Sequence, residues 1–235
     1  MNGPKADKVE QMFDNISKDY DKLNHYLSLG IDKTWRRRAL KQIVCKDSCQ
    51  NILDVACGTG DFSIEIARNS CPGTKVHGLD LSEGMLAEMR RKVAIEGLED
   101  RIDMVRGNCE RLEFPDDSFD RVTIAFGIRN VENREKALRE MYRVLKPGGK
   151  LVILELSMPS APVIGALYRF YFLKVLPWIG GLVSGEKAAY RYLPASVVKF
   201  PGKEEWMQTM GECGFGSVTH KAFTLGICRM YVGSK

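Results

Sequence analysis

The feature that most constrains this chain of 235 residues is a glycine turn, Gly58-Thr59-Gly60, which follows a short apolar segment. That segment, residues 51–56, has the composition of a buried strand, and residues 61–68 have the apolar spacing of a helix. In such a unit, glycines let the backbone N–H groups of the turn approach a ligand at the carboxyl edge of a sheet. We therefore expect Gly58 and Gly60 to contact a bound nucleoside.

Polar residues at the next strand ends indicate which nucleoside this is. A dinucleotide-binding turn needs Gly or Ala where this chain has Ser63. Asp80 ends the second expected strand, where a carboxylate can accept hydrogen bonds from both ribose hydroxyls. Asn108 follows the third expected strand and can bind an adenine edge, while Leu81 contacts a face of the ring. Each residue also fits an ordinary turn, but their occurrence at successive strand ends favours a nucleoside site.

Short apolar segments alternate with amphipathic helical segments through the middle of the chain. This alternation predicts the α/β class, with a mostly parallel, doubly wound sheet. A turn, Lys146-Pro147-Gly148-Gly149, is expected before the fifth strand. The five expected parallel strands are 51–56, 75–80, 102–105, 119–126 and 150–156, and an antiparallel pair, 217–224 and 227–232, closes the chain.

We expect one domain, residues 1–235, with three segments around the core at 51–156. Residues 1–50 have helical periodicity and form an N-terminal helical cap, and residues 203–235 form a closing helix and hairpin. The segment 157–202 contains an apolar stretch, 161–183, that is interrupted by Arg169, Lys174 and Pro177. Because charges within a bilayer are costly, we interpret this stretch as a lid over an apolar ligand.

Charge and cysteine content bound the class of protein further. The net charge of +5 is modest and spread along the chain, so no nucleic-acid partner is expected. Seven scattered cysteines form no disulfide framework, which favours a reducing cytosol. Cys45 and Cys49 have no second Cys or His pair at zinc-ligand spacing, so no metal is expected.

Motifs along nearly the whole chain resemble the quinone-biosynthesis C-methyltransferases, which methylate demethylmenaquinol and, in some members, a polyprenyl methoxybenzoquinol. The stretches that carry the resemblance include Asp19-Tyr20-Asp21-Lys22-Leu23-Asn24, Trp35-Arg36-Arg37, 54–61, 78–82, Phe126-Gly127-Ile128-Arg129-Asn130, 142–149 and Tyr190-Arg191-Tyr192-Leu193. The resemblance implies a class I methyltransferase with a seven-stranded sheet and S-adenosylmethionine as cofactor. It also implies that Thr59, Asp80, Asn108 and Cys109 contact that cofactor.

The quinol reaction implied by the resemblance needs a nucleophilic ring carbon. Ionising the adjacent hydroxyl, which resembles a tyrosine phenol with a pKa of about 10, pushes electron density onto that carbon. We expect Arg129, at the end of the fourth strand, to stabilise the phenolate. A guanidinium stays protonated, so the proton is expected to leave through water with help from Asn130 and Tyr20. The alternative is that Arg129 pairs with an acidic residue of the following helix, Glu132 or Glu135.

The polyprenyl tail of such a quinol needs an apolar groove, which the stretch 161–183 and the N-terminal helices could supply. The same surface could contact a membrane, with Arg36, Arg37 and Arg38 near anionic head groups, although three arginines on a helix also fit a solvated face. The expected location is therefore cytoplasmic, with a peripheral position at the membrane as a further expectation. A homodimer stays open.

Four other functions are alternatives. A methyltransferase for another small molecule would use the same motifs, and one for RNA would show a stronger basic stripe. A dehydrogenase or a catalytically silent binding module can be built on the same sheet. Within the quinol family, activity on a 2-methoxy-6-polyprenyl-1,4-benzoquinol as well as demethylmenaquinol is the alternative to a single substrate.

Overall fold

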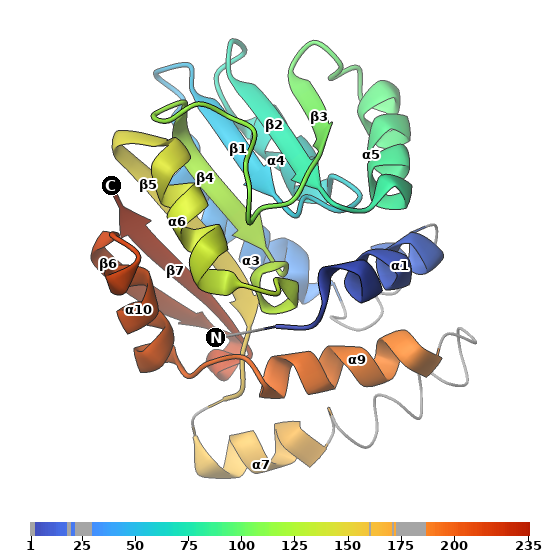
Figure 1. The fold of residues 1–235 in the computed structure, drawn as a ribbon. Coiled ribbons are helices and arrows are strands. Elements are labelled where there is room, and N and C mark those ends of the chain that lie inside the picture. Colours follow the sequence, from blue (N-terminus) through green and yellow to red (C-terminus); the bar gives the residue numbers. More distant parts are fainter. Residues whose placement is uncertain (1–2, 18–19, 22–29, 160, 171, 173–186) are drawn as a thin grey trace.

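The computed structural model describes residues 3–17, 20–21, 30–159, 161–170, 172 and 187–235, and element numbers follow Figure 1. The elements up to β4 are α1 (Ala6–Ile16), α3 (Ile31–Ile43), β1 (Asn51–Val55), α4 (Asp61–Asn69), β2 (Lys75–Asp80), α5 (Glu83–Ile95), β3 (Ile102–Arg106) and β4 (Phe119–Ala125). The remaining elements are η1 (Ile128–Asn130), α6 (Arg134–Val144), β5 (Leu145–Leu156), α7 (Pro162–Phe170), α9 (Lys187–Val198), α10 (Lys203–Glu212), β6 (Gly216–Phe223), η3 (Thr224–Gly226) and β7 (Cys228–Ser234).

The seven described strands form one sheet in the order β3-β2-β1-β4-β5-β7-β6. The strands β1 to β5 pair in parallel, while β7 lies antiparallel between β5 and β6. This confirms the expected α/β class and the mostly parallel sheet. Because β1 pairs with both β2 and β4, the strand order reverses beside β1, which is where ligands bind in open α/β sheets. In Figure 1, α1 and α9 lie beyond this carboxyl edge.

Both faces of the sheet are buried by helices. Successive residues of β1 point to opposite faces: Ile52 packs in a cluster with residues of α3, α4 and α5, and Leu53 in a second cluster with residues of α6 and α10. Met89 of α5 and Trp206 of α10 are fully buried in these two clusters. The near-continuous apolar strands are therefore what a sheet covered on both sides requires.

The helix α5 has the start and the buried face that its sequence predicts. The Ser82 hydroxyl accepts a hydrogen bond from Met85 N (3.1 Å) and caps the first turn. The apolar positions at three-to-four spacing, Met85, Leu86, Met89 and Val93, are the buried residues of this helix.

The expected turn before the fifth strand lies within β5, which begins at Leu145. Its pairing with β4 shifts register between Phe119 and Arg121. Gly148, with φ of 78°, donates a backbone hydrogen bond to Lys235 O (2.9 Å), and Lys235 N donates to Gly149 O (3.0 Å). These ladder-like bonds continue the sheet through a segment whose glycines indicated a turn.

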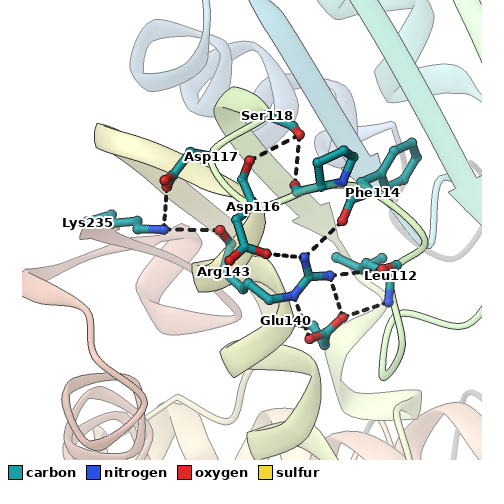
Figure 2. A network of polar contacts seen from close by, with 9 residues as sticks. Leu112, Phe114, Asp116, Asp117, Ser118, Glu140, Arg143 and Lys235 are labelled. Atoms are coloured by element: carbon teal, nitrogen blue, oxygen red, sulfur yellow. Dashed lines mark hydrogen bonds and ion pairs between the residues drawn. The ribbon is translucent and has the colours of Figure 1, made fainter.

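The loop between β3 and β4 is fixed by Arg143 of α6 (Figure 2). The guanidinium donates to Phe114 O (2.9 Å) and pairs with Asp116 (2.7 Å) and Glu140 (2.8 Å). Hydrogen bonds to the two carboxylates raise the pKa of Arg143 above its ordinary value. Lys235 Nζ donates a further hydrogen bond to the backbone oxygen of Arg143 (3.0 Å). Polar contacts thus order this loop where it has no regular secondary structure.

About half of the expected lid, 161–183, lies outside the described residues. Its described part comprises α7, Ala161 and Phe172; Phe170 at the end of α7 is 65% exposed, whereas Phe172 is buried. The helix α9 was not expected, because Pro194 lies inside it and proline is unfavourable in a helix interior. Within the described ranges, no helix has both the length and the apolar character needed to cross a bilayer.

Replacing Gly60 with Ala is expected to lower the free energy of unfolding by about 1–3 kcal/mol more than replacing Gly97. Both glycines have positive φ, 82° and 61°, so each alanine adds left-handed strain of about 1 kcal/mol. A Cβ at Gly60 would overlap Met89 Cγ, whereas one at Gly97 has no atom within 4 Å. Urea unfolding followed by circular dichroism measures both, and equal losses would exclude contact with Met89 as the cause.

Candidate cofactor and substrate site

A large pocket lies at the carboxyl edge of β1, β2, β3 and β4. Its empty volume, together with the open solvent at its mouth, is about 760 Å³. The lining includes five of the residues expected to hold the cofactor, namely Gly58, Asp80, Leu81, Asn108 and Cys109. It also includes Tyr20 and Asn130, two of the expected catalytic residues. We call this cavity the larger pocket.

A second cavity, the smaller pocket, also borders the glycine turn. Its lining combines Thr59 with charged side chains from several elements: Asp21, Arg36, Asp54 and Asp61. Both pockets are lined by a shared group, Tyr20, Ala56, Gly58, Ala125 and Phe126. The two cavities therefore adjoin at the ends of β1 and β4.

The backbone is strained where the two pockets adjoin. Ala56 and Phe126, which follow β1 and β4, have φ of 50° and 58°, values that non-glycine residues seldom adopt. Gly127 cannot carry a side chain because its Cβ would lie 2.7 Å from that of Ala56. Such strain persists only where the surrounding structure imposes it, and it is concentrated at binding and catalytic sites.

Asp80 lies at the end of β2 with its carboxylate at the glycine turn. Gly58 N donates to Oδ2 (2.8 Å) and Ser82 N donates to Oδ1 (2.9 Å). Burial raises the pKa of Asp80, and these backbone hydrogen bonds act in the opposite direction. Each carboxylate oxygen has a second lone pair, so Asp80 can also accept bonds from a vicinal diol.

Thr59 and Gly60 do not line the larger pocket, whereas Gly58 does. The Thr59 hydroxyl donates to Asp21 Oδ1 (2.6 Å) and accepts from Lys92 Nζ (3.0 Å). Lys92 also pairs with Asp21 (2.5 Å) and Asp61 (2.6 Å), so this network ties the segment that carries Tyr20 to the turn. Gly60 is not among the described residues lining either pocket, and its lack of a side chain accommodates Met89. Cofactor contacts by both residues stay predictions.

The arginine at position 36 is not a surface cation, and its expected contact with head groups is wrong. Arg36 is 7% exposed, pairs with Asp32 (2.9 Å) and Asp61 (3.4 Å), and lines the smaller pocket. Arg37 and Arg38 are exposed. The helix face with Arg36 packs against α4, and spacing alone could not distinguish this face from a solvated one.

Asp54 forms part of the wall of the smaller pocket from within β1. Its Oδ2 accepts from Ser63 Oγ (2.5 Å), while Oδ1 is buried without a hydrogen-bond partner among the described residues. Burial raises the pKa of Asp54 to about 7. Asp21 and Asp61 already pair with Lys92, so Asp54 Oδ1 is the carboxylate oxygen of this pocket that is left for a further hydrogen-bond donor.

Arg129 pairs with Glu155 at the end of β5, and with neither Glu132 nor Glu135. Its Nη1 lies 2.7 Å from Glu155 Oε1, and its backbone N donates to Oε2 (3.1 Å). Burial lowers the pKa of Arg129, but Glu155 outweighs it and the pKa lies above its ordinary value. Arg129 is 5% exposed and absent from the described lining of both pockets. It is therefore a buried, protonated cation next to Asn130 in η1.

One wall of the larger pocket is formed by α1, through Val9 and Phe13. The sequence predicts an apolar groove at the N-terminal helices, but helical spacing did not identify these two residues as lining a pocket. A ring contact joins Phe13 to Tyr20 (centroids 5.8 Å apart). Within the part of the chain that the structure describes, no group of acidic, histidine or cysteine residues could hold a metal ion.

Comparisons with known proteins define the class and then the family. The fold resembles an S-adenosylmethionine-dependent methyltransferase from Thermotoga maritima (TM-score 0.68, 20% identity, 96% of this chain and 99% of that chain). It also resembles phosphoethanolamine N-methyltransferase 2 of Haemonchus contortus in complex with S-adenosyl-L-methionine (TM-score 0.62, 17% identity, 86% of this chain and 52% of that chain). The chain thus has the fold of S-adenosylmethionine-dependent methyltransferases.

The chain belongs to the ubiE/COQ5 methyltransferase family, whose model matches residues 1–235. The ubiquinone/menaquinone biosynthesis C-methyltransferase UbiE of Geotalea daltonii is 49% identical over 231 residues, which cover 98% of this chain and 97% of that protein. The demethylmenaquinone methyltransferase of Bacteroides fragilis is 46% identical over 233 residues, 99% of this chain and 94% of that protein. The expected resemblance is confirmed.

Proposed function

We propose that this chain transfers a methyl group from S-adenosylmethionine to a ring carbon of demethylmenaquinol, which gives menaquinol. Membership of the family supports this reaction, as do the names of relatives that match nearly end to end. The observation that carries it is the pair of adjoining pockets at the switch point of the sheet, because one accommodates a nucleoside and the other a charged amino-acid end.

The larger pocket suits the adenosine part of the cofactor. Asp80 is placed for the ribose hydroxyls, Asn108 and Cys109 for the adenine edge, and Leu81 for a face of the ring. The smaller pocket suits the ammonium of the methionine part, because Asp54 Oδ1 is buried there without a hydrogen-bond partner among the described residues. When bound, S-adenosylmethionine supplies a methyl group on a sulfonium, which needs no activation of its leaving group.

The remaining chemistry concerns the quinol hydroxyl. Asn130 and Tyr20 line the larger pocket and can reach a substrate oxygen, while Arg129 is the buried neighbour of Asn130 in η1. A buried guanidinium stabilises negative charge more strongly than a solvated one, so we assign phenolate stabilisation to Arg129. Because Arg129 stays protonated, the proton leaves through water, with Tyr20 and Asn130 orienting it.

Radiolabelled methyl transfer tests the reaction. Reduced demethylmenaquinone and the 2-methoxy-6-polyprenyl-1,4-benzoquinol are assayed side by side, and label in the naphthoquinol product is the expected result. Label in both products would assign dual specificity, the alternative substrate range. A failure to label either quinol, with S-adenosylmethionine bound in calorimetry, would point to another acceptor and overturn the proposal.

Replacing Arg129 with Lys is expected to lower kcat by at least about tenfold, with little change in S-adenosylmethionine affinity. Lysine keeps the charge but cannot contact Glu155 and Ser196 at once, as Arg129 does through Nη1 (2.7 Å) and Nε (3.3 Å). The matched control is Arg139→Lys on α6, where the arginine is 59% exposed. Wild-type turnover in the Arg129 variant would contradict the assignment.

We also place the enzyme at the cytoplasmic membrane face, since its proposed substrate has a polyprenyl tail. The exposed Phe170 on the apolar helix α7 supports such a contact. Replacing Phe170 with Asp is expected to lower the fraction that floats with phosphatidylglycerol vesicles, whereas replacing exposed Leu225 with Asp is the control. Equal flotation of the Phe170 variant and the wild type would contradict this position.

A further inference from the structure

A hydrogen bond connects α9 with the larger pocket. The Tyr192 hydroxyl donates to Asn130 Oδ1 (2.8 Å). Tyr192 is half-buried and does not line the pocket, whereas Asn130 does and is 8% exposed. The amide oxygen of Asn130 is therefore held by a residue that does not line the pocket and that lies 62 positions later in the sequence.

This contact decides which atom Asn130 offers to a ligand. A side-chain amide has an acceptor oxygen and a donor nitrogen. Tyr192 engages the oxygen, and none of the described residues accepts a hydrogen bond from Asn130 Nδ2. The nitrogen is thus the polar atom that remains for a molecule in the larger pocket.

The surroundings of Tyr192 favour the donor role of its hydroxyl. The charged groups that face it are Arg129, Glu155 and Arg134. Burial raises the pKa of Tyr192, Glu155 adds to this effect, and the two arginines oppose it. The phenol therefore keeps its proton at neutral pH.

We propose that Tyr192 is a positioning residue, which turns the amide nitrogen of Asn130 toward a substrate oxygen in the larger pocket. The inference rests on the proposed function and changes the role of Asn130 within it. Asn130 donates a hydrogen bond to the developing phenolate and does not help to accept its proton. One turn along α9, the Ser196 hydroxyl accepts from Arg129 Nε (3.3 Å), so the same helix face holds both residues.

The first test replaces Tyr192 with Phe, which removes the hydroxyl and keeps the ring. We expect kcat to fall about tenfold, the ratio for one hydrogen bond of about 1.4 kcal/mol, while KM and S-adenosylmethionine affinity stay within about threefold. The acid limb of the kcat pH profile should move to higher pH, since the phenolate loses a donor. The matched control is Tyr142→Phe on α6, whose ring packs on Phe215 away from the pocket.

A double-mutant cycle separates positioning from a general structural role. If Tyr192 acts through Asn130, Tyr192→Phe has no further effect on kcat in an Asn130→Ala background. A second tenfold loss in that background would overturn the inference. So would an unchanged kcat in the single Tyr192 variant, or a loss that comes with weakened cofactor binding and a lowered melting temperature.

Binding of a nitronaphthol dye distinguishes this inference from the proposed function. The colour of the dye reports its ionisation, so no methyl transfer is needed. The wild type is expected to lower the pKa of the bound dye more than the Tyr192→Phe variant does. If this difference appears while neither quinol is methylated, the proposed function fails and the role of Tyr192 stands. Equal dye pKa values in both proteins would overturn that role.

Discussion

Replacing Glu155 with Ala is expected to lower the free energy of unfolding by about 3–5 kcal/mol and to abolish methyl transfer. The Glu155 side chain is fully buried and accepts from Arg129 Nη1 (2.7 Å), Arg129 N (3.1 Å) and Leu156 N (2.8 Å). Its removal leaves the Arg129 guanidinium buried without a carboxylate, beside a second buried arginine, Arg134. Urea unfolding of wild type and variant measures the loss.

Two controls show whether the loss comes from an uncompensated charge. Glu113→Ala removes an exposed partner of Arg111 (3.2 Å) and is expected to cost less than about 1 kcal/mol. The double variant Arg129→Met, Glu155→Leu replaces the buried pair with apolar side chains and should recover most of the stability, yet stay inactive. A Glu155→Ala variant that loses less than about 1 kcal/mol would refute this account.

Replacing Asp80 with Asn is expected to weaken S-adenosylmethionine binding by about 100-fold or more. Hydrogen bonds to a charged group contribute about 1.5–3 kcal/mol each, and two ribose hydroxyls are expected to bond Asp80. The variant also loses an acceptor for Gly58 N or Ser82 N, which lie 2.8 and 2.9 Å from the carboxylate. Isothermal titration calorimetry measures the change in Kd.

The control for Asp80 is Asp103→Asn on the adjacent strand β3. Asp103 Oδ2 lies 3.5 Å from Nδ1 of His77, which is on the same strand as Asp80. The Asp103 side chain is 59% exposed and is not among the described residues that line the larger pocket. Its replacement is expected to leave cofactor affinity unchanged. A Kd for the Asp80 variant within about threefold of the wild type would remove Asp80 from the ribose site.

The parts of the molecule that sequence predicts well are those set by local periodicity. The bounds of β2 and the buried face of α5 follow from alternation and from three-to-four spacing with Ser82 as cap. The lining of the larger pocket by Asp80 and Asn108 follows from topology, because parallel strands end at one sheet edge.

Contacts across the sheet could not be predicted in this way. Local spacing pointed Arg129 toward Glu132 or Glu135, yet its partner is 26 positions away on β5. Only the pairing of β4 with β5 brings Glu155 beside the residues that follow Ala125. The link between Tyr192 and Asn130 was equally hidden, since α9 contains a proline and its sequence does not indicate a helix.

The wall that α1 forms has a kinetic consequence. Val9 and Phe13 close one side of the larger pocket, and α1 is held there by Asp14, which accepts from Ser82 Oγ (2.5 Å) and Gly84 N (3.0 Å). Tyr20 follows α1 by four residues and lines the place where the two pockets adjoin. A cofactor in the larger pocket would contact α1 and Tyr20 together. The two substrates should bind in a compulsory order, with the methyl donor first and its demethylated product last to leave.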